Sequence, residues 1–316
     1  MKPRRTGRRV AWVLLAACAA GGVQAQSLIP RAYLITPVGS NALVLSYERL
    51  DGGLQFDGAL PITGATADVN LSTLSFYHSL DLLGRSANIT MGVPYADGDF
   101  KGTIREIPRS GEKSGTLDSY LRFSVNLLGG PAMSPKQFTG WRQDKLLGMS
   151  LIIVAPTGQY DPTRLLNWGS NRWAFKPEIG YSQGWGRWVL DAYGAVWFYA
   201  ENPDFFSFSR FFPNVTHTQS EQSVFTVETH LSRNFGPRLW VSVDANFWSG
   251  GATGLNGVVN RLTDQRSSRV GLTASFPLTQ TQSIKLSFSD GAYVHFGGNY
   301  RSISLGWQYS WIDGSR

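Results

Sequence analysis

Ionisable side chains recur at every second position inside several short apolar segments. Arg172, Lys176 and Glu178 alternate with apolar residues in a run that ends at Tyr181. Charges in such a row can line a pore and filter solutes by size and charge, or they can pair with one another and fill the space between them. The sequence leaves both readings open. The other candidates of this kind are Arg187, Asp191, Glu228, Asp244, Arg269 and Lys285.

Aromatic side chains share these positions in one segment and crowd one later stretch. Tyr193 and Trp197 have the same parity as Asp191, so they could form a stacking site for an aromatic ring. The predicted connection 200–218 is unusually apolar for a solvated loop. We interpret it either as a hydrophobic gate for apolar solutes or as a loop that buries its own rings. Its phenylalanines are Phe205, Phe206, Phe208, Phe211 and Phe212.

The residues that could serve catalysis do not form a recognised motif. Glu228 and His230 share a face, but no nucleophile elbow accompanies them. The four histidines are scattered singly, without the spacing of metal ligands. No glycine loop for phosphate and no dinucleotide fingerprint is present. We therefore predict no enzyme activity, no catalytic residue, no metal site and no cofactor.

Period-two alternation assigns these residues to β-strands, because successive side chains of a strand point to opposite faces. In the segment 300–311, for example, Ile303, Leu305 and Trp307 alternate with serine and glycine. The sequence predicts about twelve strands. They lie near 42–50, 67–80, 86–96, 116–128, 146–156, 171–182, 187–199, 219–233, 239–248, 266–276, 283–294 and 300–311.

The first residues are typical of an export signal. A basic start is followed by an apolar run from Val10 to Ala20 and by the small-residue end Val23-Gln24-Ala25. We predict a signal peptide over 1–25 and one domain over 26–316; processing and lipidation at Cys18 is the alternative. The leader holds five of the 29 basic residues and none of the 22 acidic ones. The remainder therefore has 24 basic against 22 acidic residues, which argues against nucleic-acid binding.

The connections between the predicted strands are alternately long and short. Long ones lie at 51–66, 97–115, 157–170, 200–218 and 249–265, and most of the others are tight turns. This pattern is typical of outer-membrane barrels, which have short periplasmic turns and longer external loops. The fourth connection, 129–144, is long where a turn is expected, so we interpret it as a periplasmic segment or a plug-like helix. The fold prediction is all-β: a transmembrane antiparallel up-and-down barrel of about twelve strands in a Gram-negative outer membrane.

The final predicted strand resembles the signal that the barrel-assembly machinery recognises, with Gly306 followed by Tyr309 and Trp311. Aromatic clusters at strand ends, such as Trp197 to Tyr199, predict a girdle at the membrane surface. We therefore expect outer-membrane lipid and the assembly machinery as partners.

Several short motifs together resemble a known family, the outer-membrane proteins grouped with the phenol meta-cleavage degradation pathway and described as transporter-like. They include Pro30-Arg31-Ala32-Tyr33, Ala155-Pro156-Thr157-Gly158 and the run from Asn167 to Glu178. The resemblance implies an outer-membrane barrel that passes small aromatic or hydrophobic compounds passively. The alternative from another class is a non-conducting structural or adhesion barrel that binds partners through its external loops.

Overall fold

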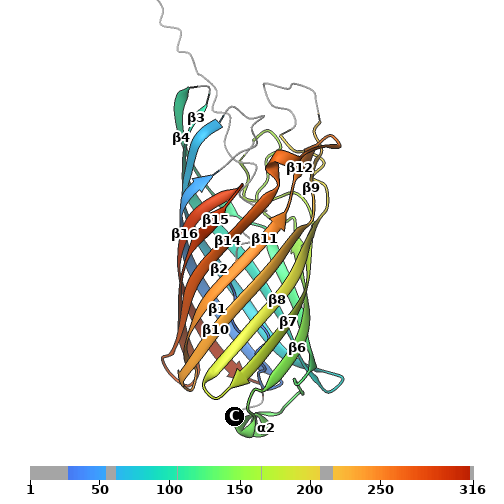
Figure 1. The fold of residues 1–316 in the computed structure, drawn as a ribbon, viewed down its shortest axis with the longest axis vertical. Coiled ribbons are helices and arrows are strands. Elements are labelled where there is room, and N and C mark those ends of the chain that lie inside the picture. The colour runs from blue at the N-terminus through green and yellow to red at the C-terminus, as the bar shows by residue number, and fades with distance from the viewer. Residues whose placement is uncertain (1–27, 55–61, 105, 165, 207–215, 314–316) are drawn as a thin grey trace, which may run out of the picture.

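The computed structural model describes residues 28–54, 62–104, 106–164, 166–206 and 216–313. The predicted signal peptide therefore lies outside the described residues. Within them the chain forms an antiparallel β-barrel whose strands tilt around a common axis (Figure 1). Each strand of the barrel wall pairs with its neighbours in chain order, and the pairing of the first strand with the last closes the barrel.

Twelve of the described strands form the barrel wall, so the predicted fold is confirmed. They are β1 (Ser40–Leu54), β2 (Ile62–Leu82), β3 (Arg85–Ile104), β5 (Ser119–Leu128), β6 (Lys145–Ala155), β7 (Ala174–Trp185), β8 (Trp188–Tyr199), β10 (Val224–Gly236), β11 (Leu239–Gly250), β14 (Gln265–Pro277), β15 (Gln282–Val294) and β16 (Gly298–Ile312).

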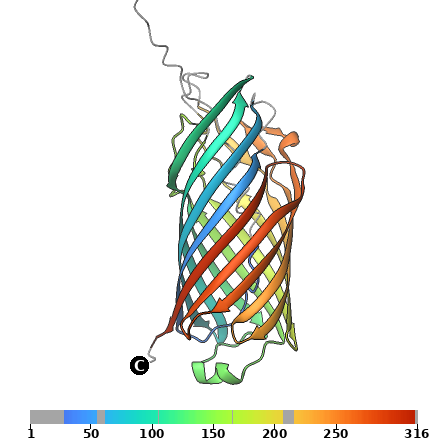
Figure 2. The same ribbon diagram turned by 90° about the vertical axis from the view of Figure 1, so that its left-hand side faces the viewer.

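The predicted loop at 97–115 is wrong, because most of it is strand. β3 continues to Ile104, and β4 (Ile107–Thr116) folds back along its upper half. This hairpin rises beyond the other strands (Figure 2). Its outward side chains, including Asp97, Asp99 and Lys101, are polar and exposed. Because these outward residues are polar, the sequence of the hairpin looks like that of a loop. The buried positions between them nevertheless keep the period of a strand.

The outer face of the barrel changes character along each strand. On β3 the outward side chains of Met91, Val93 and Tyr95 are apolar and about half exposed, and the charged positions Asp97 and Asp99 follow them. An exposed apolar belt suits contact with lipid, whereas charges at mid-depth would cost about 2–4 kcal/mol each for Arg or Lys. The change therefore marks the membrane surface near Tyr95. No helix in the described part of the chain is long and apolar enough to cross a membrane.

The two ends of the barrel differ as the connection lengths predict. Tight turns, the C-terminal end of β16 and the short helix α2 (Pro135–Gly140) lie at one end (Figure 1). In outer-membrane barrels this end faces the periplasm. The predicted helix in connection 129–144 is thus present, with Ser134 forming its capping box. It buries none of its residues and lies beyond the end of the barrel, so it is not a plug.

Long connections fold together at the opposite, external end. A small sheet there consists of β9 (Gln219–Glu221), β12 (Thr253–Leu255) and β13 (Val258–Asn260), and the 3-10 helix η1 (Arg261–Thr263) follows it. The connection 156–173 turns inward, and its Trp168 packs against Phe100 with ring centroids 5.8 Å apart.

The predicted aromatic girdle is therefore only partly right. Trp168, Trp197 and Trp248 are buried, whereas Trp173 and Trp185 face outward and are about half exposed. Parity explains the difference, because Trp197 and Trp248 occupy inward positions of their strands.

Candidate functional site

The lumen of the barrel contains a stretch of chain that the sequence pattern did not predict. Residues 28–39 precede the first strand; we call them the N-terminal segment. A Cβ atom on Gly271, halfway along β14, would lie 2.8 Å from Leu28, so the segment starts at about mid-height. It ends beside Ser79, whose backbone oxygen accepts from Gly39 near the periplasmic end. The segment thus occupies the periplasmic half of the lumen.

Tyr33 fixes the middle of this segment and is completely buried. Its ring lies on two glycines that face each other across the β6–β7 pair, Gly148 and Gly180. A Cβ atom on either glycine would lie within 2.2 Å of a Tyr33 ring carbon. The hydroxyl donates a hydrogen bond to Glu178 over 3.0 Å and lies 3.2 Å from the Ser150 hydroxyl. Glycine is therefore required at both positions to make room for the ring.

Residues on either side of Tyr33 bind the wall as well. The backbone N–H of Arg31 donates to Asp191 over 3.3 Å, and its guanidinium donates to Asn234 over 2.8 Å. The N–H of Ala32 donates to the hydroxyl of Tyr193 over 3.0 Å. The predicted lumen residues Asp191 and Tyr193 thus hold the segment.

Thr36 reaches a more distant part of the barrel wall, where its hydroxyl lies 2.7 Å from that of Tyr77 on β2. Ile35 is buried against Met133 and Leu146 at the periplasmic end. The segment is thus attached to several strands of the barrel and covers part of its cross-section.

A network of ion pairs lines the barrel beside the N-terminal segment. We call Lys176, Glu178, Glu228, His230 and Asp244 the charged wall; all five are buried. Lys176 lies 2.9 Å from Glu178 and 3.2 Å from Glu228, and His230 lies 2.8 Å from Asp244. These residues come from β7, β10 and β11.

Neighbouring groups complete the charged wall. Arg122 on β5 lies 3.6 Å from Glu178, and the hydroxyls of Ser242 and Thr273 donate to Asp244 over 2.8 and 2.7 Å. Buried charges are tolerated only when partners of this kind surround them. Among the described residues no group of three or more His, Cys, Asp or Glu side chains could hold a metal ion.

The side of the lumen opposite the charged wall is lined mostly by small side chains. We call Ser46, Lys285, Ser287, Ser304 and Gly306 the small-residue wall; they lie on the adjacent strands β1, β15 and β16. All alternate with outward apolar residues, so they face inward, yet none is buried and Lys285 is exposed. An inward side chain reaches solvent only when the lumen beside it is open. The barrel is therefore filled on one side and accessible on the other.

The remaining predicted site residues are more dispersed than the sequence suggested. Arg269 is buried on β14, where it donates to Ser289 over 2.9 Å. Arg172 lies outside β7 and pairs with Glu221 of the external sheet. Arg187 is exposed in the turn before β8, so its placement in the lumen is wrong. It has the inward parity but lies beyond the end of the strand.

The predicted aromatic groups are also separated from each other. Trp197 faces inward and packs in a buried cluster with Trp248 and Val224. Phe206 is buried and Phe205 is half-buried. Phe208, Phe211 and Phe212 lie outside the described residues. Burial of Phe206 agrees with a loop that packs its own rings; the gate remains a prediction.

Sequence reasoning missed Arg122, Tyr33 and the glycine pair beneath the Tyr33 ring. The signal was present, because Arg31 and Tyr33 stand between two prolines before the first strand, and Gly148 and Gly180 occupy inward positions. Glycine at an inward position indicates a close approach of another group.

Comparisons with known proteins agree with this architecture. The sequence matches the family described as "Putative MetA-pathway of phenol degradation" over residues 51–310. The chain belongs to this family. No curated protein matches it.

Two solved structures are similar to this member of the family. The COG4313 outer membrane channel from Pseudomonas putida F1 is 17% identical, with a TM-score of 0.73 over 90% of this chain and 100% of that chain. The transport unit of the autotransporter AIDA-I from Escherichia coli is 10% identical, with a TM-score of 0.52 over 92% of this chain and 95% of that chain. At these identities the likeness shows the fold, an outer-membrane barrel.

Proposed function

We propose that the protein is a passive channel for small solutes, whose path follows the small-residue wall past the N-terminal segment. The observation that carries the proposal is the solvent exposure of inward side chains on β1, β15 and β16, with Lys285 the most exposed of the small-residue wall. A barrel filled for purely structural reasons would bury these positions as completely as it buries the charged wall. The likeness in fold to a COG4313 outer membrane channel supports the same function.

The solutes that we propose are small aromatic compounds that carry a polar group. The family description refers to phenol degradation, which supports an aromatic substrate. Serine hydroxyls and a lysine suit the polar group of such a molecule better than they suit a wholly apolar one. Catalysis has no place in this proposal, since Glu228 and His230 are engaged in the ion pairs of the charged wall.

Export and assembly complete the proposal. The basic and apolar leader supports cleavage after Ala25, and N-terminal sequencing of the purified protein tests it. The aromatic pattern of β16 supports insertion into outer-membrane lipid by the barrel-assembly machinery.

Planar-bilayer conductance and liposome uptake of phenol test the channel. We expect Gly306→Trp, purified and reconstituted at the same amount of folded protein as the wild type, to reduce both by most of their value, because a side chain there projects into the open part of the lumen. The backbone tolerates the change, since a Cβ on Gly306 would meet no atom closer than 3.9 Å. Gly194→Trp is the matched control: Gly194 has the outward parity of β8, and nothing lies within 4 Å of its added Cβ.

The wild-type result decides between the two function classes. If the wild-type protein, folded and inserted, passes neither ions nor phenol, the channel is excluded and a structural or adhesion barrel remains. If it passes both but Gly306→Trp conducts like Gly194→Trp, the path does not follow the small-residue wall.

A further inference from the structure

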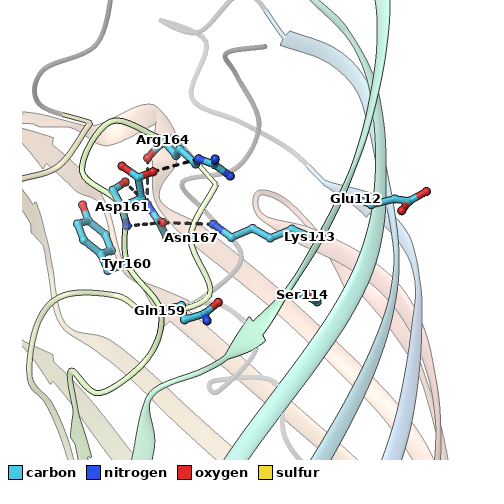
Figure 3. Close-up of a pocket in the computed structure, with 8 residues that line it drawn as sticks. All are labelled: Glu112, Lys113, Ser114, Gln159, Tyr160, Asp161, Arg164 and Asn167. Carbon is cyan, nitrogen blue, oxygen red and sulfur yellow. Dashed lines mark hydrogen bonds and ion pairs between the residues drawn. The ribbon is translucent and has the colours of Figure 1, made fainter.

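A recess lies at the external mouth of the barrel, apart from the lumen site. It has a volume of about 460 Å³, and β4 and the inward-folded connection 156–173 form its sides. Figure 3 shows Lys113 reaching from β4 towards this connection, while Glu112 points to the other side of the strand. A recess of this size falls within the usual range for small-molecule sites, roughly 300–1,000 Å³.

Two cationic groups converge in the recess, and one carboxylate accompanies them. The ammonium of Lys113 donates to the backbone oxygen of Leu166 and, over 3.2 Å, to the side-chain oxygen of Asn167. Arg164 comes from the connection that faces β4 and pairs with Asp161 over 3.0 Å. Among the described residues no carboxylate lies within 4 Å of the Lys113 ammonium, so its charge is not neutralised by an ion pair.

Both burial and nearby charge act on the ammonium of Lys113. Burial and then the charge of Arg164 lower the pKa of Lys113 to about 8, against the opposing effect of Asp161. Hydrogen bonds from Thr163 and the charges of Arg164 and Lys113 outweigh burial and lower the pKa of Asp161, which therefore stays ionised. An anion between the two cations would relieve their repulsion.

The donors that remain match an oxyanion. The ammonium of Lys113 has three N–H donors, of which two are used in the bonds described above. The guanidinium of Arg164 has five, of which one is used. Tyr160 also lines the recess, but Figure 3 draws its ring beyond Asp161 and Asn167 as seen from Lys113, and its hydroxyl is engaged with Asp204 and Asn202. The recess therefore offers cationic donors for a carboxylate.

We propose that this recess binds small aromatic carboxylates at the external mouth, with Lys113 and Arg164 holding the carboxylate. The inference rests on the proposed function for the aromatic part of the ligand and deepens it, because the recess selects those solutes that carry a carboxylate. It predicts that binding is strongest while Lys113 is protonated. The affinity for the carboxylate should therefore be highest below about pH 8. It should decrease as the pH rises through the pKa of Lys113 in the complex, which the bound anion shifts upward.

Titration of the detergent-solubilised protein with benzoate, followed by ligand-observed NMR, tests the site without any need for conduction. We expect Lys113→Met to weaken benzoate binding by about tenfold or more, the usual effect of losing a charged hydrogen-bond partner. Lys101→Met is the matched control, because Lys101 is exposed on the same hairpin and does not line the recess. Arg164→Gln should also weaken benzoate binding.

Three results would overturn the assignment. They are no benzoate binding by the wild-type protein, an equal loss of affinity in Lys101→Met, and binding of benzamide as tight as that of benzoate. Inorganic phosphate that binds as tightly as benzoate would reject an aromatic ligand in favour of any oxyanion. If Lys113→Met does not fold, the wild-type protein at pH 6.5 and pH 10.5 decides, since affinity independent of pH contradicts a role for Lys113. A protein that binds benzoate but does not conduct would reject the channel and retain the recess.

Discussion

The charged wall and the small-residue wall face the same lumen but differ in how they use it. On the charged wall each ion has a partner within 3.6 Å, and the N-terminal segment covers it through Tyr33 and Glu178. On the small-residue wall four of the five residues are serine or glycine, and Lys285 remains exposed. The difference shows that one part of a barrel can be filled while another part stays open. The size of the inward side chains and their ion pairing decide which occurs on each strand.

Removing a cation from each wall should give the largest contrast. Lys176→Met leaves Glu178 and Glu228 buried without the ammonium between them, so we expect the free energy of unfolding to fall by about 3–5 kcal/mol. Lys285→Met removes an exposed charge and should change it by about 0.5 kcal/mol or less. Urea unfolding in lipid vesicles, followed by tryptophan fluorescence, measures both. Equal losses would remove the distinction between the walls.

Displacing Tyr33 should have a smaller effect on stability and a clear one on current. In Gly180→Ala the new Cβ would lie 2.0 Å from a ring carbon of Tyr33, so the ring must leave its position. We expect single-channel conductance to increase severalfold as the N-terminal segment loosens. Tyr33→Phe is the control, because it keeps the ring and loses only the hydroxyl, and it should conduct nearly as the wild type does. Unchanged current in Gly180→Ala would show that the segment does not narrow the path.

The sequence predicted the barrel well because lipid imposes a strict pattern on the outer face. Leu305 and Trp307 face lipid, so the strand period follows from their spacing, and the strand number follows from how many segments of this kind the chain contains. The hairpin of β3 and β4 was predicted as a loop since Asp97 and Asp99 rise above the membrane, where this constraint ends.

The candidate site was predicted less completely, because its contacts depend on strand register and on chain outside the strands. Parity placed Lys176 and Glu228 in the lumen, but only the register of β7, β8 and β10 brings them to 3.2 Å. The N-terminal segment has no periodic pattern at all. Tyr33 can be recognised as its anchoring residue only once the register shows that Gly148 and Gly180 lie opposite each other.

The most direct test of the account asks which wall a solute meets. The only cysteine in the sequence is Cys18, so the chain from Leu28 onward offers no native thiol. Single cysteines can therefore be placed at Ser304 on the small-residue wall and at Ser232, an inward and fully buried position on β10.

The measurement is the change in single-channel current when a charged methanethiosulfonate reagent is added to each variant. The account predicts that current through Ser304→Cys falls as the reagent attaches, and that Ser232→Cys does not react. Block of Ser232→Cys with no effect on Ser304→Cys would contradict it, because the path would then run along the charged side of the barrel.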